Sequence, residues 1–430
     1  MAEITRESNR VGSLLATTNR VEAPFVRVQI GNFSFGVFER KRLKADQRNG
    51  VVSELAEKYP NYVQSLTVKK INGTVNQYRL SIRYQINEDN DPNFFEKIFS
   101  SVSDTFKITF TYGDAMLPNY VYRDEEAIIT KITNDFDING AAISYVIEAV
   151  STSSLSLSGT YTFPSVTAKP SDKIKEILWN NSKYHLTDVF KGMRDRSLVE
   201  MSNFIASDDK RVKIPTCTNM SVLEYIAFLV SYMNPTGSTT NSAIKQNVYS
   251  LMTYEDVQDQ YGGPYFKVQK IQRASSSLNQ LCTYNVDIGY PSANIVTNFS
   301  IMNNQNWSLF YKYNRDLGNS DYLTRIDTEG KIEKIYSPQL SNGRYEMTQA
   351  DSTWWTKVTQ YPVEATMTLR GLLKPAILMQ YVKVNIWYFG KLHIASGYYL
   401  ITSQEDVINV NDGYKTTLKL LRVAGAEEII

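Results

Sequence analysis

The sequence has few of the residues from which catalytic and metal sites are usually built. Its 430 residues include only two histidines and two cysteines. His185 and His393 belong to no HExxH motif or ligand cluster, which leaves little basis for zinc chemistry or for Ser-His-Asp catalysis. Cys217 and Cys282 stand outside any CxxC motif and are typical of small, buried, apolar residues. We therefore predict a structural protein that is not an enzyme and carries no cofactor.

Motifs for nucleotides and membranes are missing as well. The sequence has no GxxxxGK[ST] loop and no GxGxxG after a strand-like run, so nucleotide binding is not expected. No run of about 18 apolar residues occurs, which excludes a membrane-spanning helix. The formal net charge of +2 creates no field that would hold nucleic acid. Residues 1–22 are polar and lack the apolar core of a signal peptide, so we expect a protein that is used in a cytosol-like compartment or leaves it by a route that needs no signal.

Two acidic segments resemble parts of functional sites. Residues 135–140 match the opening of an EF-hand loop, but position twelve, which should be a bidentate Glu, is Val146. We interpret this segment as a hairpin turn. Asp124, Glu125 and Glu126 could be imagined as glycosidase carboxylates. Because adjacent residues of a strand point to opposite faces, we interpret them instead as solvated or interface charges.

Alternating apolar and polar residues dominate the N-terminal part of the chain. The alternation is interrupted at Gly31-Asn32, Asn72-Gly73 and Asn139-Gly140, and such pairs are strong signals for tight β-turns. The 29 tyrosines suit either strands or surfaces that contact partners. The predicted elements are hairpins at 25–38 and 62–86, a helix near 92–103, and strands at 105–112 and 126–150.

The pattern changes after residue 150. A Ser/Thr-rich stretch at 151–168 is typical of a linker. Ser171-Asp172 is expected to cap one helix, and Ser221 and Glu224 form the capping box of another. The remaining expectations are a surface excursion at 236–263, strands within 264–310, a long loop or insertion at 314–356, and a clear β region at 362–423.

The two strongest β regions repeat one pattern. In each, an alternating strand ends in an aromatic-Gly turn, a strand containing Ile-Thr follows, a polar hairpin turns at Asn-Gly or Asp-Gly, and a long alternating strand closes the unit. Ile129-Thr130 precedes Gly140 in the first, and Ile401-Thr402 precedes Gly413 in the second. Hairpins can be alike by chance, but the joint match predicts an internal duplication. A cyclic trimer would then place six similar modules around one axis and pair strand edges that are otherwise exposed.

Several C-terminal segments resemble a known family. They are residues 371–375, 382–386, 396–401 (SGxYxI) and 413–420 (GYxTxLxL). Together they are similar to the closing barrel of bacteriophage tail-hub proteins, the baseplate hub or late-control D type of contractile tails and related injection machines. Many members have a His after the YxI strand, where this chain has Gln404, Glu405 and Asp406, so details that depend on that His do not transfer. The N-terminal module and residues 286–292 also resemble hub sequences.

The resemblance implies a homotrimer whose six tube-like domains form a pseudo-hexameric ring. Such a ring joins the sixfold tail tube to the threefold central spike protein. It would contact the tail tube or a tube-initiator protein and the baseplate wedge proteins, and tape-measure protein and DNA would pass through it. The implied location is the virion tail baseplate, assembled in the host cytoplasm, with no membrane partner. The alternatives are a hub of a non-viral contractile injection system and a tail-associated peptidoglycan hydrolase.

The predicted fold class is α+β and β-dominated, with two tube-type antiparallel β-barrel or sandwich domains flanking a mixed middle domain. The predicted divisions are an N-terminal arm (1–24), a first tube-like β domain (25–155), a mixed α/β middle domain (156–285), and a second tube-like β domain (286–430) with an insertion near 314–356. Ring packing is expected to place two strands between subunits. Their residues are Ile108, Phe110, Tyr112, Val382, Val384 and Ile386.

Overall fold

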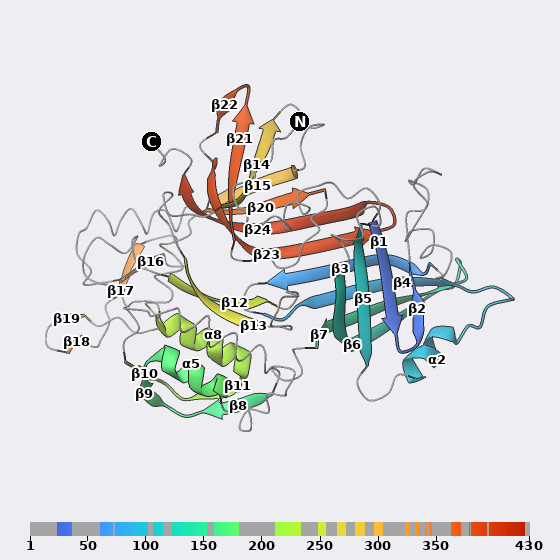
Figure 1. Cartoon of the computed structure of the whole chain (residues 1–430), viewed down its shortest axis with the longest axis horizontal. Coiled ribbons are helices and arrows are strands. Elements are labelled where there is room, and N and C mark those ends of the chain that lie inside the picture. The colour runs from blue at the N-terminus through green and yellow to red at the C-terminus, as the bar shows by residue number, and fades with distance from the viewer. Residues whose placement is uncertain are drawn as a thin grey trace.

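The protein is built mainly of β-strands, most of which belong to one 14-stranded sheet (Figure 1). This confirms the β-dominated fold class. The structure is a computed structural model. It describes residues 24–36, 61–71, 74–101, 106–114, 123–152, 159–179, 211–233, 248–254, 265–271, 280–288, 296–303, 323–326, 332–335, 340–341, 344–345, 363–370, 378, 380–393 and 395–425. The basic residues Arg40, Lys41, Arg42 and Lys44, whose pattern predicts a solvated loop, lie outside these residues, as does the end of the predicted strand region 264–310 from residue 304 onward.

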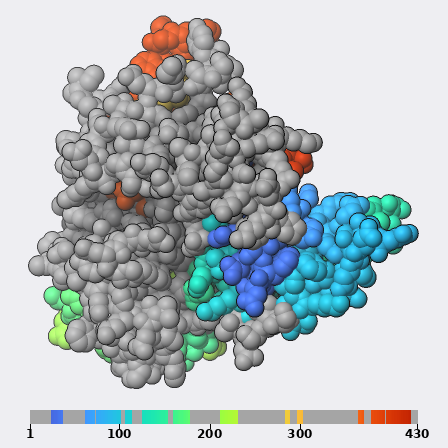
Figure 2. Space-filling model, turned by 45° about the vertical axis from the view of Figure 1, so that its right-hand side comes forward, coloured from blue at the N-terminus to red at the C-terminus, as the bar shows by residue number. Residues whose placement is uncertain are grey.

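The N-terminal part of the chain forms what we call the first β module. Its strands are β1 (Pro24–Ile30), β2 (Phe33–Phe35), β3 (Val63–Ile71), β4 (Gln77–Gln85), β5 (Lys107–Asp114), β6 (Arg123–Asp137) and β7 (Ala142–Ser151), and its helix is α2 (Phe94–Ser101). Both predicted hairpins and the strand pair at 126–150 are confirmed. Gly31 adopts a φ of 58°, which glycine tolerates at a tight turn. Figure 2 shows this module, in blue and cyan, projecting at the right-hand side.

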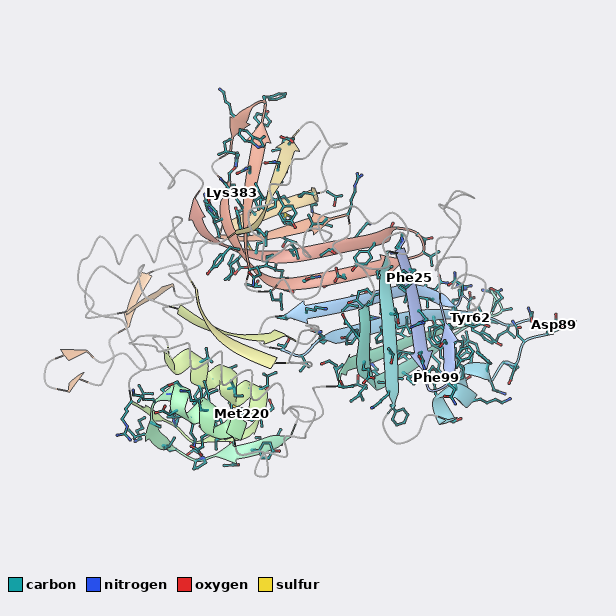
Figure 3. All side chains as sticks on the ribbon, in the orientation of Figure 1. Phe25, Tyr62, Asp89, Phe99, Met220 and Lys383 are labelled. Carbon is teal, nitrogen blue, oxygen red and sulfur yellow. The ribbon has the colours of Figure 1, made fainter. Side chains whose placement is uncertain are left out.

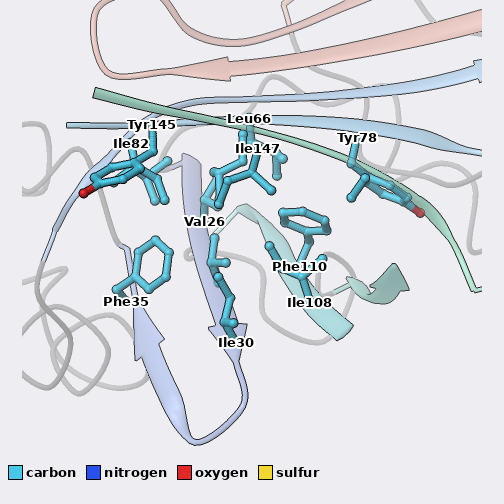
Figure 4. Close-up of a cluster of buried hydrophobic side chains, with 14 of the residues drawn as sticks. Val26, Ile30, Phe35, Leu66, Tyr78, Ile82, Ile108, Phe110, Tyr145 and Ile147 are labelled. Atoms are coloured by element: carbon cyan, nitrogen blue, oxygen red, sulfur yellow. The ribbon is translucent and has the colours of Figure 1, made fainter. Parts of the chain in front are cut away.

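One apolar core fills the first β module. Side chains of β1, β2 and β5 face those of β3, β4 and β7, and Figure 4 shows Val26 and Phe110 on one side with Leu66 and Ile147 on the other. The period-two alternation places these residues inward. Helix α2 closes one end, where Phe95 is buried and packs edge-on against Phe35 at 5.5 Å between ring centroids. Figure 3 shows Tyr62 and Phe99 at this end and Asp89 further out.

The middle part of the chain combines helices with short strands. Its elements are β8 (Thr160–Phe163), β9 (Val166–Ala168), α5 (Pro170–Trp179), β10 (Val212–Ile214), β11 (Cys217–Ser221), α8 (Val222–Met233), β12 (Val248–Tyr254) and β13 (Tyr265–Ile271). Both predicted helices are confirmed. The capping box also forms, because the Ser221 backbone N–H donates to Glu224 Oε2 at 2.8 Å and the Glu224 N–H donates to Ser221 Oγ at 3.2 Å.

The prediction of an irregular linker is wrong in part, and the segments predicted as a surface excursion and as a long loop or insertion also contain strands. The predicted linker at 151–168 contains β8 and β9, and the predicted surface excursion at 236–263 contains β12. The predicted insertion at 314–356 contains two hairpins, β16 (Leu323–Ile326) with β17 (Ile332–Ile335) and β18 (Leu340–Ser341) with β19 (Arg344–Tyr345). Threonine and tyrosine carry polar groups but have high strand propensity. A stretch rich in these residues can therefore pair as a strand even though its composition is polar.

The C-terminal part forms the second β module. Its strands are β14 (Gln280–Ile288), β15 (Val296–Asn303), β20 (Val363–Leu369), β21 (Tyr381–Tyr388), β22 (Lys391–Leu392), β23 (Gly397–Asn409) and β24 (Gly413–Gly425). A second apolar core includes Met367, Val384 and Leu418. The predicted β region at 362–423 is confirmed. The domain boundary predicted between 285 and 286 falls inside β14, and the division into domains stays a prediction.

Candidate assembly interface

The two β modules are joined edge to edge in one continuous sheet. β3 of the first module pairs antiparallel with β23 of the second, from Ser403 opposite Ile71 to Asn409 opposite Ser65. The first residues of β23 pair instead with β21, as far as Leu400. A register shift after Ile401 separates these two stretches, and such bulges bend a strand. Figure 1 shows β23 and β24, in red, beside β3 and β4, in blue. We call the β3–β23 junction the seam.

Apolar side chains cross the seam. Ile408 of β23 and Tyr414 of β24 belong to the core of the first module, although both come from the second. Ile408 is fully buried opposite Leu66, which is also fully buried. The two modules therefore share core residues, and the first module covers part of the second.

A buried ion pair lies next to the seam. Lys70 is 0% exposed and Glu125 is 7% exposed, and Lys70 Nζ lies 3.1 Å from Glu125 Oε1. Tyr112 donates its hydroxyl hydrogen to Glu125 Oε1 and Tyr78 donates to Glu125 Oε2, each at 2.7 Å. Burying two charges is costly unless each is paired and hydrogen-bonded. The Glu125 carboxylate makes one ion pair and accepts two tyrosine hydrogen bonds, which offset the cost of its burial.

A second buried polar group lies directly across the seam. Gln404 is the Cα partner of Lys70 in the β3–β23 ladder. Its side-chain amide donates to Asp406 Oδ2 at 2.8 Å, and Thr416 Oγ1 donates to Asp406 Oδ1 at 2.5 Å. All three side chains are buried. A shift of β23 by one residue would turn these polar groups to the wrong face, so the two groups together fix the register of the seam.

The interpretation of Glu125 as a solvated or interface charge is wrong. The side chain is buried within its own chain because it is in phase with Ala127 and Ile129, both inward-facing residues of β6. Lys70 is likewise in phase with the buried Val68 on β3. Both charged residues occupy inward positions of alternating strands. The buried pair could therefore have been predicted from the alternation pattern in the sequence.

The two modules have the same strand order. Their main strands, numbered in chain order, are β1, β3, β4, β5, β6 and β7 in the first module and β14, β15, β20, β21, β23 and β24 in the second. In both, the strands lie in the order first, fourth, fifth, sixth, third, second. One difference is that β1 pairs antiparallel with β5, whereas β14 pairs parallel with β21. The duplication predicted from the sequence is therefore confirmed at the level of strand order.

The residues predicted to lie between subunits are core residues within one chain. β5 pairs with β1 on one edge and β6 on the other, and β21 pairs with β14 and β23. Both edges of each strand are thus occupied. The six side chains are buried in the two cores: Ile108, Phe110, Tyr112, Val382, Val384 and Ile386. Their contact with a second subunit stays a prediction.

The segment that resembles a calcium loop forms a hairpin turn, as predicted. The Gly140 N–H donates to Asp137 Oδ1 at 2.8 Å, and Arg83 Nη2 lies 2.9 Å from Asp137 Oδ2. These contacts hold the pKa of Asp137 below its ordinary value, chiefly through the hydrogen bond from Gly140.

In the part of the chain that the structure describes, no helix has the length and apolar content needed to cross a membrane.

Comparison with solved structures finds tail proteins. The chain aligns with a 43 kDa tail protein of prophage MuSo2 from Shewanella oneidensis, with 9% identity over 93% of this chain and 98% of that one and a TM-score of 0.48. A tail protein from Neisseria meningitidis MC58 gives 8% identity, coverage of 93% and 97%, and a TM-score of 0.45. No family model matches the chain, and no curated protein matches its sequence.

A third structure comes from a secretion system. It is an Escherichia coli protein described as a component of the type VI secretion system that resembles tail proteins of bacteriophage T4. It aligns with 84% of this chain and 73% of its own, at 6% identity and a TM-score of 0.39.

Proposed function

We propose that this chain is a structural hub subunit of a phage tail baseplate, which trimerises into a pseudo-hexameric ring. The observation that carries the proposal is the seam. One chain contains two modules of the same strand order, joined side by side through β3 and β23. If successive chains join as the two modules do, three chains supply six modules around one axis.

The ring would match two symmetries. Its six modules would present a sixfold arrangement to the tail tube or tube-initiator protein, and its three chains a threefold arrangement to the central spike protein. The division into domains also belongs to the proposal. It comprises an N-terminal arm (1–24), a first tube-like domain (25–155), a middle domain (156–285) and a second tube-like domain (286–430). Wedge proteins would bind the periphery, and tape-measure protein and DNA would pass through the channel.

Light scattering after size-exclusion chromatography tests this proposal. The expected mass is three times the 49.1 kDa of one chain. Negative-stain averages of the same fraction should show a ring with six lobes and a central hole. A mass of one chain at every concentration, alone or mixed with the spike protein, would contradict the proposal. Clearing of peptidoglycan on a zymogram by that single-chain species would favour the hydrolase instead.

A further inference from the structure

Part of β6 has an unused edge. Its first residues, 123–128, pair with β5, and residues 127–137 pair with β7 on the other side. From 131 to 137, no strand in the described part of the chain pairs with the edge that faces away from β7. Apolar side chains are exposed to solvent at this stretch. Phe136 is 63% exposed, and Ile138, just beyond it, is 91% exposed. Such an edge with exposed apolar groups is a ready partner for another strand.

The same stretch of the second module is occupied by the seam. β23 corresponds to β6, and the threonine of the matching Ile-Thr pair is the extra residue of a bulge in each strand, Thr130 after Ile129 and Thr402 after Ile401. Residues 403–409 of β23 therefore correspond to residues 131–137 of β6. Ile408 corresponds to Phe136 and is 0% exposed because β3 and its module lie against it. The exposure of Phe136 is thus what remains when the equivalent of β3 is missing.

The equivalent of β3 is β15, and its outer edge is also unused. β15 pairs with β20 on one side and ends the sheet order among the described strands. Its eight residues include no charged residue and no proline. Edge strands that stay exposed to solvent usually carry one or the other, which prevents pairing with another chain. β15 and β6 cannot meet in one chain, because β20, β24, β23, β3, β4 and β7 lie between them in the sheet.

The register follows from the rows of paired residues. In the first module, Leu66 pairs with Leu80, which pairs with Ile147. In the second, Phe299 pairs with Met367, which pairs with Leu418. Both rows end two residues after the threonine of the bulge, at Ile132 and at Gln404. Phe299 is therefore the equivalent of Leu66.

We propose that β15 of one copy of this chain pairs antiparallel with residues 131–137 of β6 in the next copy, repeating the seam between chains. This inference rests on the proposed assembly and adds its strands and register. Phe299 then lies opposite Phe136, as Leu66 lies opposite Ile408 in the seam. Ser300 lies opposite Asp135, and no acidic residue faces another acidic one.

The pairing is energetically favourable on two grounds. Phe136 loses its exposure to water against Phe299, which already packs edge-on against Tyr399 at 5.8 Å, and cross-strand aromatic pairs stabilise neighbouring strands. The two unused edges also gain backbone hydrogen bonds. Since the contact joins different surfaces, it is head-to-tail, and it closes into a ring only if the rotation between copies permits.

Disulfide trapping tests the register. Asp135→Cys and Ser300→Cys together place two cysteines directly opposite each other, within the Cα separation that a disulfide needs. Under mild oxidation the double variant should give covalent dimers and trimers on non-reducing gels. A mixture of the two single variants should stop at dimers. The matched control combines Ser300→Cys with Lys131→Cys, which shifts one partner by four residues, roughly 13 Å along the strand, and should not cross-link.

A second variant separates this inference from the proposed function. Phe136→Asp should convert the assembly to monomers at concentrations where the wild type is trimeric, while Phe389→Asp, at a side chain 73% exposed on the β21–β22 turn, should leave the trimer intact. A wild-type trimer that neither cross-links at 135 and 300 nor responds to Phe136→Asp would overturn the strand pairing and leave the hub proposal standing. A monomeric wild type would overturn both.

Discussion

Thr130 and Thr402 make the same hydrogen bond at equivalent positions of the two modules. Thr130 Oγ1 donates to the backbone carbonyl of Glu148 at 3.1 Å, and Thr402 Oγ1 donates to that of Lys419 at 3.2 Å. Each threonine is the extra residue of a β-bulge, and each acceptor lies on the next strand of the hairpin. The hydroxyl thereby bonds across the hairpin at the point where the bulge interrupts the ladder.

Replacing either threonine by valine should destabilise the chain. Thr130→Val and Thr402→Val keep the branched shape but remove the donor, and loss of such a hydrogen bond costs about 1 kcal/mol. Urea denaturation of the single and double variants would measure it, and the two effects should add because the sites are far apart. Thr109→Val, in a regularly paired stretch of β5, is the matched control and should change stability by less than about 0.5 kcal/mol. Equal losses from all three variants would refute a special role for the bulges.

Removing one partner of the buried ion pair should be far more damaging. Lys70→Met leaves the Glu125 carboxylate buried without its cation, and breaking a buried pair in this way costs about 3–5 kcal/mol. Lys70→Met with Glu125→Gln removes both charges and keeps an acceptor for the tyrosine hydroxyls, so part of the loss should be recovered. Thermal and urea denaturation would compare the variants.

An exposed ion pair provides the control for that experiment. Lys97→Met breaks the pair between Lys97 and Asp91, whose side chains are 69% and 40% exposed. Exposed pairs of this kind contribute between about 0 and 1 kcal/mol. If Lys70→Met is no worse than Lys97→Met, the polar cluster beside the seam contributes little to the fold.

Local features of the fold could be predicted from the sequence, whereas its long-range pairings could not. The hairpin at Gly31, the turn at Gly140 and the capping box at Ser221 depend on residues a few positions apart, and each forms as expected. The pairing of β3 with β23 joins strands more than 300 residues apart, and any alternating strand of the chain could have served as partner. The parallel pairing of β14 with β21 also joins strands that are distant in the sequence, as Asn285 opposite Asn385 shows.

The candidate site shows the same division. The repeated Ile-Thr and Asn-Gly or Asp-Gly sequence pointed to two similar modules, and the strand order agrees. The strands chosen from the sequence as contacts between subunits, β5 and β21, pair on both edges within the chain, and their contact with a second subunit stays a prediction. Which edges are unused depends on the whole sheet, so β15 and the end of β6 could be found only in the structure.

Tyr399 should make stability depend on alkaline pH. Burial raises the pKa of its phenol to about 12, from an ordinary value of 10.0, and its hydroxyl donates to the Ala395 carbonyl at 2.5 Å. Because the folded-state pKa is the higher one, the stabilisation is complete below pH 10 and is lost as the pH rises through about 12. Tyr399→Phe should be less stable at neutral pH and lose less stability across this window. Tyr388→Phe, at a half-exposed side chain, should follow the wild type throughout.

The capping box of α8 should respond to mutation and to acid. Ser221→Ala removes the hydroxyl that receives the Glu224 N–H, and loss of such a cap costs about 1 kcal/mol. The pKa of Glu224 lies below its ordinary value of 4.5, first because the Ser221 backbone N–H and then because its hydroxyl donate to the carboxylate. The folded-state pKa is the lower one, so this contribution is present above pH 4.5 and is lost as the pH falls through the folded-state value. Glu224→Gln should therefore flatten the acid limb of the denaturation profile. An unchanged acid limb in Glu224→Gln would show that the carboxylate does not stabilise the helix start.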